Sequence, residues 1–209
     1  MMKKIIGRII LKLLGWKINK DIPKELFDKC IVIAAPHTSN WDFLISIYSL
    51  AVLGVNLRYT IKKEWMRPPY GWFFRIMGGL GVDRSPQNKG ENPISLVDAI
   101  ANIFDNHDKL AVMVQAEGTR SLQSNWKTGF YYIALKAKVP IALGYLDYKD
   151  KIGGIGKVIY PTGDINKDMM KIMEFYKDIH PKFPEKFSLD DRFYPKTKKS
   201  TTSDNPLQK

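Results

Sequence analysis

The chain has almost no cysteine, and this scarcity limits its chemistry. Cys30 is the only cysteine among 209 residues, so an intramolecular disulfide and a thiolate metal cluster are both excluded. A single thiol fits a reducing compartment. Because Cys30 precedes the apolar run 31–35, we expect it to be a small buried residue.

Long hydrophobic runs are also missing. A membrane-spanning helix needs about eighteen or more consecutive apolar residues. The longest candidate, residues 43–55, contains Ser46, Tyr48 and Ser49. We expect this segment to be a buried helix, so the sequence favours a protein that lies on a membrane over one that crosses it.

Several catalytic signatures are absent as well. The chain has no Gly-x-Ser-x-Gly segment, which argues against a serine hydrolase of that type. It has no His or Cys spacing typical of zinc, so we expect no metal. His107 lies in the polar stretch Asp-Asn-His-Asp, where we expect a solvated loop residue.

Acidic residues are missing from the first twenty positions, although six of the lysines and arginines lie there. Lys4, Arg8 and Lys12 recur every four residues and share one helical face, while aliphatic residues fill the rest. This pattern predicts a basic amphipathic helix over residues 1–20 that lies in an anionic membrane interface. The alternative is a helix that packs on the domain with its charged face in water.

The whole chain carries a formal charge of +12, which suits nucleic acid, an anionic membrane or an acidic protein partner. No helix-turn-helix, zinc-finger or aromatic RNA-binding signature accompanies the charge. We therefore expect no nucleic-acid partner. We expect a peripheral protein on the cytoplasmic face of the cell membrane.

Short apolar runs alternate with longer helical patterns between residues 21 and 180. The alternation predicts a single α/β domain with a mostly parallel central sheet flanked by helices. We expect strands at 30–35, 58–61, 80–82, 110–115, 141–145 and 157–160, and helices at 41–54, 70–77, 91–105, 127–138 and 167–178. From residue 181 to 209 prolines and lysines dominate, and we expect a tail whose last part, residues 196–209, is disordered.

A candidate catalytic pair follows the first buried strand of this domain. Pro36 stops the strand, and His37 then lies in a strand-to-helix loop, where open α/β sheets place their ligands. Asp42 follows five residues later and could orient the imidazole as a general base. The alternative role of Asp42 is that of a capping acid in a Ser39-x-x-Asp42 box, and the two roles can coexist.

A second candidate loop, Glu117-Gly118-Thr119-Arg120, follows the strand at 110–115. Gly118 lets the backbone turn closely, Arg120 can grip a phosphate with two hydrogen bonds, and Glu117 could orient polar groups of a ligand. The alternative is a surface turn with a solvated ion pair. The stretch from Gly79 to Arg84 repeats the arrangement, since it ends a third strand with glycines and a cation.

Together these blocks resemble the glycerolipid acyltransferase family, whose best-known members are the 1-acylglycerol-3-phosphate acyltransferases. The resemblance covers roughly residues 28–147 and depends on the order and spacing of the blocks. The matching blocks are His37-x4-Asp42, Gly79–Arg84, Glu117-Gly118-Thr119-Arg120-Ser121 and Val139-Pro140-Ile141. Two departures concern the acceptor: Ala116 replaces the usual proline, and Thr38 and Trp41 lie inside the first block.

The resemblance implies direct acyl transfer with His37 as base and Asp42 as its orienting carboxylate. It implies acyl-CoA or acyl carrier protein as donor, no other cofactor, and a lysophospholipid acceptor, foremost 1-acylglycerol-3-phosphate, which would become phosphatidic acid. The expected acceptor-binding residues are Arg84, Glu117, Gly118, Thr119, Arg120 and Lys127, although Lys127 could equally be a solvated lysine. The alternatives are another acceptor, such as a lyso-amino-acid lipid, and a non-catalytic lipid-binding module.

Overall fold

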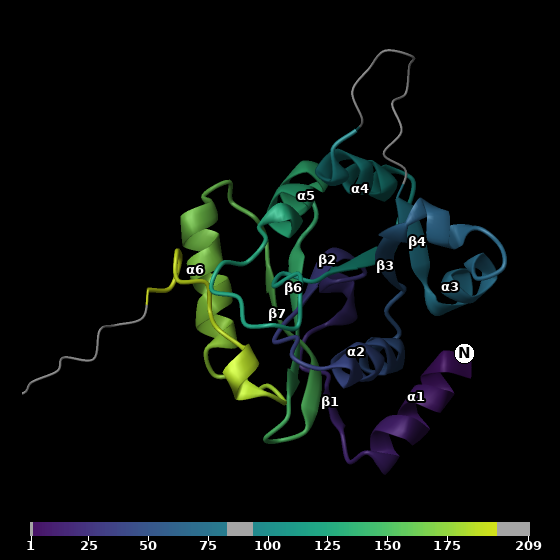
Figure 1. Cartoon of the computed structure of the whole chain (residues 1–209), viewed down its shortest axis with the longest axis horizontal. Helices are drawn as coiled ribbons and strands as arrows, with labels where there is room; N and C mark the ends of the chain where they lie inside the picture. The colour runs from purple at the N-terminus through teal and green to yellow at the C-terminus, as the bar shows by residue number, and fades with distance from the viewer. Residues whose placement is uncertain (1, 83–93, 196–209) are drawn as a thin grey trace, which may run out of the picture.

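Seven strands form one sheet in the part of the chain that the computed structural model describes, residues 2–82 and 94–195 (Figure 1). The strands are β1 (Lys17–Asn19), β2 (Lys29–Ala34), β3 (Leu57–Lys62), β4 (Gly79–Val82), β5 (Leu110–Val114), β6 (Ile141–Asp147) and β7 (Ile152–Ile159). Their order in the sheet is β1-β7-β6-β2-β5-β3-β4. Every neighbouring pair is parallel except β6 and β7, whose connection is too short for a crossover helix.

Four of the six described helices lie between consecutive parallel strands, as the alternating pattern predicts, while the first helix precedes all strands and the last follows them. The helices are α1 (Met2–Leu13), α2 (Asn40–Leu53), α3 (Gly71–Met77), α4 (Leu96–Asp105), α5 (Gly129–Ala137) and α6 (Ile165–Tyr176), with short 3-10 turns η1 (Lys24–Leu26), η2 (Lys63–Met66) and η3 (Pro184–Lys186). None of the described helices is long and apolar enough to cross a bilayer.

Central strand β2 is buried on both faces, and its alternate residues separate two cores. Ile31 and Ile33 belong to a large cluster with residues of α4, α5 and α6. Cys30 and Val32 face the other way and pack with Leu50 of α2. The sheet is therefore the middle layer of three, because α4–α6 cover one face and α2 the other (Figure 1).

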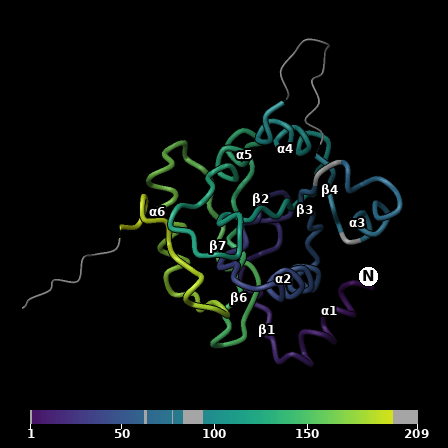
Figure 2. The backbone as a smooth tube through the Cα atoms, in the orientation of Figure 1, coloured from purple at the N-terminus to yellow at the C-terminus, as the bar shows by residue number. Residues whose placement is uncertain are grey.

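Helix α1 lies on the outside of α2 (Figure 2). Gly7 and Leu11 are its buried residues, and a side chain at Gly7 would meet the Tyr48 carbonyl oxygen at 3.1 Å. The glycine thus permits close packing of the two helices. Trp16, just beyond α1, joins Leu11 and Ile45 in a third, smaller core.

The segment after α6, residues 181–195, packs on the domain although it contains no helix or strand apart from η3. Phe187, Leu189 and Phe193 contact the large core. Asp190 is fully buried and accepts hydrogen bonds from the Trp126 amide at 2.8 Å and from the Arg192 guanidinium. Residues 196–209, where we expected disorder, lie outside the described residues.

The predicted α/β architecture with its mostly parallel sheet is confirmed, and the boundaries differ in places. The strand expected at 157–160 extends over Ile152–Ile159, and β1 was not expected at all. The helix expected from residue 91 begins at Leu96 in the described part of the chain. The segment 43–55, expected to be a buried helix, lies in α2 up to Leu53, between the sheet and α1.

Candidate active site

The two candidate loops meet at one edge of the sheet. β2 and β5 are parallel neighbours with Ile33 opposite Val114. His37 and Glu117 each lie three residues beyond the end of their strand, so the parallel register carries both to the same carboxyl edge. The backbone N–H of His37 donates to Glu117 Oε2 at 2.9 Å, which ties the loops together.

Asp42 fixes the loop that carries His37. Its Oδ2 accepts the backbone N–H groups of Thr38 at 2.8 Å and Ser39 at 2.7 Å. Ser39 is the N-cap of α2, and a complete capping box closes the first turn. The capping role expected for Asp42 is therefore confirmed, and the same carboxylate lies beside the imidazole.

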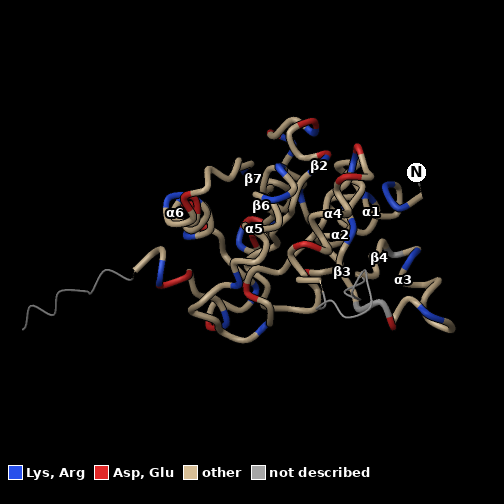
Figure 3. The backbone as a smooth tube through the Cα atoms, turned by 90° about the horizontal axis from the view of Figure 1, so that it is seen from above, with Lys and Arg blue, Asp and Glu red and all other residues tan. Residues whose placement is uncertain are grey.

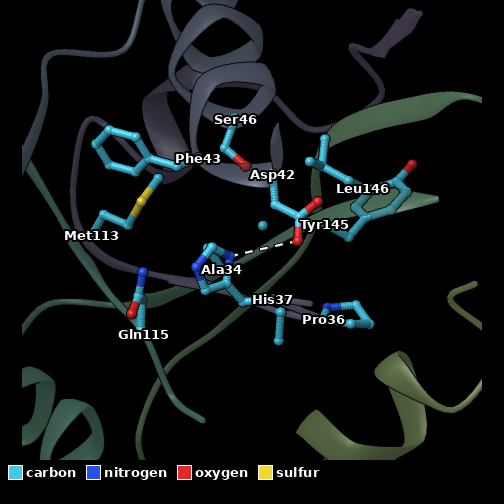
Figure 4. Close-up of a pocket in the computed structure, with 12 residues that line it drawn as sticks. Ala34, Pro36, His37, Asp42, Phe43, Ser46, Met113, Gln115, Tyr145 and Leu146 are labelled. Carbon is cyan, nitrogen blue, oxygen red and sulfur yellow. Dashed lines mark ion pairs between the residues drawn. The ribbon is translucent and has the colours of Figure 1, made fainter. Parts of the chain in front are cut away.

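The imidazole of His37 faces Asp42 with Nδ1 at 3.6 Å from Oδ2, as Figure 4 shows. This separation is longer than a hydrogen bond, so the two side chains form a close electrostatic contact and not a hydrogen bond. Burial lowers the pKa of His37. The charge of Asp42 raises this pKa and the charge of Arg120 lowers it. The net lowering keeps the ring neutral near pH 7, the form that accepts a proton.

Tyr148 is a member of the site that the sequence analysis missed. Its hydroxyl donates to Asp42 Oδ1 at 2.5 Å, so donors hold both carboxylate oxygens. The Tyr148 ring packs edge-on against Trp16 with 5.0 Å between centroids. Tyr148 follows β6, which is the other neighbour of β2, and this adjacency in the sheet has no signature in the local sequence.

Glu117 is buried, with 5% of its surface exposed. Its Oε2 accepts the His37 amide, while Oε1 has no hydrogen-bond partner among the described residues. Burial raises the pKa of Glu117 to about 7. The hydrogen bond from His37 opposes this rise, and the charge of Asp42 adds to it. In this structure Glu117 contacts the backbone beneath the imidazole.

An open cavity of about 540 Å³ lies in front of His37. Gly118, Thr119 and Arg120 contribute to its wall, which places three of the predicted binding residues together beside the imidazole of His37. The lining residues in the described part of the chain are His37, Asn40, Phe43, Gln115, Gly118, Thr119 and Arg120. Among the described lining residues Arg120 is the one cation, and its charge lowers the pKa of the His37 imidazole.

Behind the imidazole lies a second, narrow cavity of about 10 Å³ (Figure 4), which has room for about one water molecule. Its wall is mostly apolar, with Phe43, Met113 and Leu146 around the His37–Asp42 pair. Such surroundings exclude bulk water from the pair and strengthen the electrostatic interaction between the two side chains.

Gly118 and Lys127 depend on each other. Gly118 has φ +72°, and a Cβ there would lie 2.6 Å from Lys127 Cε and 2.7 Å from its Nζ. The lysine stem therefore crosses the glycine at the rim of the loop, and the Lys127 amide donates to the Ala116 carbonyl at 2.7 Å. Arg84, also predicted to bind the acceptor, lies outside the described residues.

Comparison with known proteins adds a family to this geometry. The Acyltransferase family profile matches residues 17–142, more than half of the chain. The fold resembles the crystal structure of the 1-acyl-sn-glycerophosphate (LPA) acyltransferase PlsC from Thermotoga maritima, with a TM-score of 0.53 and 18% sequence identity, covering 83% of this chain and 74% of that chain. No curated protein sequence matches. On the strength of the profile, the chain belongs to the Acyltransferase family.

Proposed function

We propose that the protein transfers a fatty acyl group from a thioester donor, acyl-CoA or acyl carrier protein, to the hydroxyl of a lysophospholipid. The foremost acceptor is 1-acylglycerol-3-phosphate, which gives phosphatidic acid. The observation that carries this proposal is the buried His37–Asp42 pair at the wall of an open cavity that also holds Arg120. The solved structure with a similar fold bears the name of an LPA acyltransferase.

The chemistry requires one base and no covalent enzyme intermediate. Nδ1 of His37 faces Asp42, which leaves Nε2 to accept the proton of the acceptor hydroxyl. The alkoxide oxygen attacks the thioester carbonyl, the new C–O bond forms, and the C–S bond breaks. The imidazolium then gives its proton to the leaving thiolate, so the base is restored.

Asp42 stabilises the charged imidazolium during this step, and Tyr148 keeps the carboxylate in place through Oδ1. Glu117 holds the backbone of His37 and thereby sets the height of the ring above the sheet. Arg120 supplies positive charge on the cavity wall, where it can bind the acceptor phosphate through two hydrogen bonds. Lys127 at the rim and Arg84 are further candidates for phosphate contacts.

We place the reaction at the cytoplasmic face of the cell membrane, where both the lysolipid and the donors are available. Helix α1 supports this location. Its buried residues are Gly7 and Leu11, whereas Ile5, Ile9 and Leu13 are exposed by 50%, 56% and 82%. A helix that only packed on the domain would bury such residues, so their exposure favours contact with lipid.

The test is free-thiol release with mass spectrometry of the product. Purified protein receives acyl-CoA or acyl carrier protein together with lysophosphatidic acid or a phosphate-free lysolipid. We expect acylation of lysophosphatidic acid that is lost in His37→Ala and strongly reduced in Asp42→Asn. Activity that survives His37→Ala would contradict the mechanism.

The identity of the acceptor is tested by Arg120→Ala beside a matched control, Arg58→Ala, which removes an arginine from β3 outside the cavity lining. For a phosphate acceptor, KM should rise in Arg120→Ala and stay unchanged in the control. Acylation of a phosphate-free acceptor with equal efficiency in both variants would identify the alternative acceptor class. If neither acyl transfer nor thiol release is detected with any acceptor, the result would support the alternative of a non-catalytic lipid-binding module.

A further inference from the structure

The connection between β3 and β4 exposes an unusual concentration of large apolar side chains. We call the following residues of η2, α3 and the turn between them the aromatic cluster: Trp65, Tyr70, Trp72, Phe73 and Ile76. Their exposed fractions are 57%, 66%, 65%, 50% and 58%. Single exposed apolar residues are normal on a protein surface, but several in one short connection indicate a contact surface.

The cluster is ordered by its own packing. Phe74, which is half-buried, forms edge-on contacts with Trp65 at 5.8 Å and with Phe73 at 5.7 Å. Trp72 adds a further edge-on contact with Phe73 at 6.3 Å. Rings that are held in place while half of their surface meets solvent lose little conformational freedom when a partner covers them.

Helix α1 continues this apolar surface. The Lys3 ammonium donates to the Ile76 carbonyl, and the start of α1 lies beside α3 (Figure 1). Ile6, Ile9 and Leu13 of α1 are exposed and recur at spacings of three and four residues, which places them on one helical face. Gly7 and Leu11 occupy the buried face, so the apolar stripe of α1 points away from the domain.

Basic residues accompany both elements. Arg67 and Arg75 are exposed within the η2–α3 connection, as are Arg8 and Lys12 on α1, and Figure 3 shows Lys and Arg positions along α1 and around α3. Tryptophan and tyrosine concentrate where a bilayer meets water, and cations beside them attract anionic headgroups. This combination fits a lipid surface better than a protein partner, whose interface would not require an amphipathic helix alongside.

We infer that the aromatic cluster is a second membrane-contact element, which inserts into the headgroup region of an anionic bilayer beside α1. The inference extends the membrane location given under the proposed function and does not depend on acyl transfer. Two anchors fix an orientation that one helix would leave free to rotate. η2 follows the carboxyl end of β3, the sheet edge at which His37 lies, so this orientation would bring the cavity near the lipid.

The experiment measures partition of the full chain into phosphatidylcholine vesicles with and without phosphatidylglycerol. The variant Trp72→Ala/Phe73→Ala removes two rings of the cluster. Its matched control is Tyr132→Ala/Tyr160→Ala, which removes two rings exposed by 48% and 61% elsewhere on the domain. We expect the partition coefficient for anionic vesicles to fall about tenfold or more in the first variant and to change by less than about twofold in the control.

A second measurement reports insertion directly. Lipids brominated in the upper acyl chain should quench the fluorescence of the wild-type protein more than that of Trp72→Phe, since Trp72 would lie within reach of the bromine atoms. Equal partition of both double variants, together with equal quenching, would overturn the inference. Loss of self-association instead of vesicle binding would assign the cluster to a second copy of the chain and would overturn it too.

An acylation assay distinguishes failure of this inference from failure of the proposed function. The aromatic cluster contributes no side chain to the described cavity wall, so both double variants should acylate a short-chain lysophosphatidic acid that is kept below its micellar concentration. Absence of acylation in the wild type as well would contradict the proposed function, while the vesicle data would still decide the role of the cluster.

Discussion

Replacement of Glu117 by glutamine tests whether this carboxyl group is a protonated structural element. Burial raises its pKa to about 7 from an ordinary value of 4.5. A raised carboxyl pKa means that the folded state binds the proton more tightly than the unfolded state does. The resulting stabilisation is complete below about pH 4.5 and is lost as the pH rises through 7.

The size of the effect follows from the same values. A difference of one pKa unit corresponds to about 1.4 kcal/mol, so ionisation of Glu117 should cost roughly 3 kcal/mol over the whole range, with most of it between about pH 5 and about pH 8. The Glu117 side chain is almost fully buried, so solvent screens little of this penalty. Glutamine keeps an oxygen for the His37 amide and cannot ionise.

The assay is urea unfolding of the wild type and of Glu117→Gln, each at about pH 5 and at about pH 8. Other groups titrate in the two proteins alike, so the difference between them isolates Glu117. We expect the variant to lose less stability than the wild type between the low and the high pH, by about 2–3 kcal/mol. The control is Glu185→Gln at an exposed site in η3. Parallel pH profiles for the wild type and Glu117→Gln would refute the reasoning.

Three further predictions concern the site and its support. Because burial lowers the pKa of His37, the acid limb of kcat/KM should lie below pH 6.5, and an initial-rate pH series would contradict this with a limb at or above that value. Tyr148→Phe removes the donor to Asp42 Oδ1, so kcat should fall about tenfold with KM unchanged, whereas a change in KM alone would assign Tyr148 to binding. Tyr176→Phe removes a buried hydroxyl that donates to the carbonyl of Gly144 at 2.9 Å, so the free energy of unfolding should fall by about 1 kcal/mol. A thermal unfolding midpoint equal to that of the wild type would contradict this prediction.

The sequence was sufficient for the parts of the fold that have a local cause. Apolar runs of strand length, such as Cys30–Ala35, alternate with helical periods, and this alternation leads to a parallel sheet through the geometry of its connections. The pair His37 and Asp42 could be found because both residues lie in one loop and the helix turn that follows it. Residues so close along the chain are brought together by local structure alone, without a long-range contact.

Other features depend on contacts that the chain makes over long distances. Tyr148 and Asp42 are 106 residues apart and meet because β6 lies next to β2. The buried position of Glu117 depends on the register between β2 and β5, so its motif could suggest a ligand contact but not its bond to the His37 backbone. Phe187 and Phe193 pack on the core without any periodic pattern, which explains why residues 181–195 looked like a tail.

Asp42 links α1, the helix that we propose to contact the membrane, to the imidazole of His37. Its carboxylate receives the Tyr148 hydroxyl, the Tyr148 ring packs against Trp16, and Trp16 is buried immediately after α1. Trp16, which packs the end of α1 on the domain, therefore also supports the Asp42 carboxylate through Tyr148. Truncation at residue 18 would remove the Trp16 contact with Tyr148 together with the exposed apolar stripe of α1. Substitutions at Ile9 and Leu13 alter the stripe alone, so they separate the effect of membrane contact on activity from an effect on the geometry of the His37–Asp42 pair.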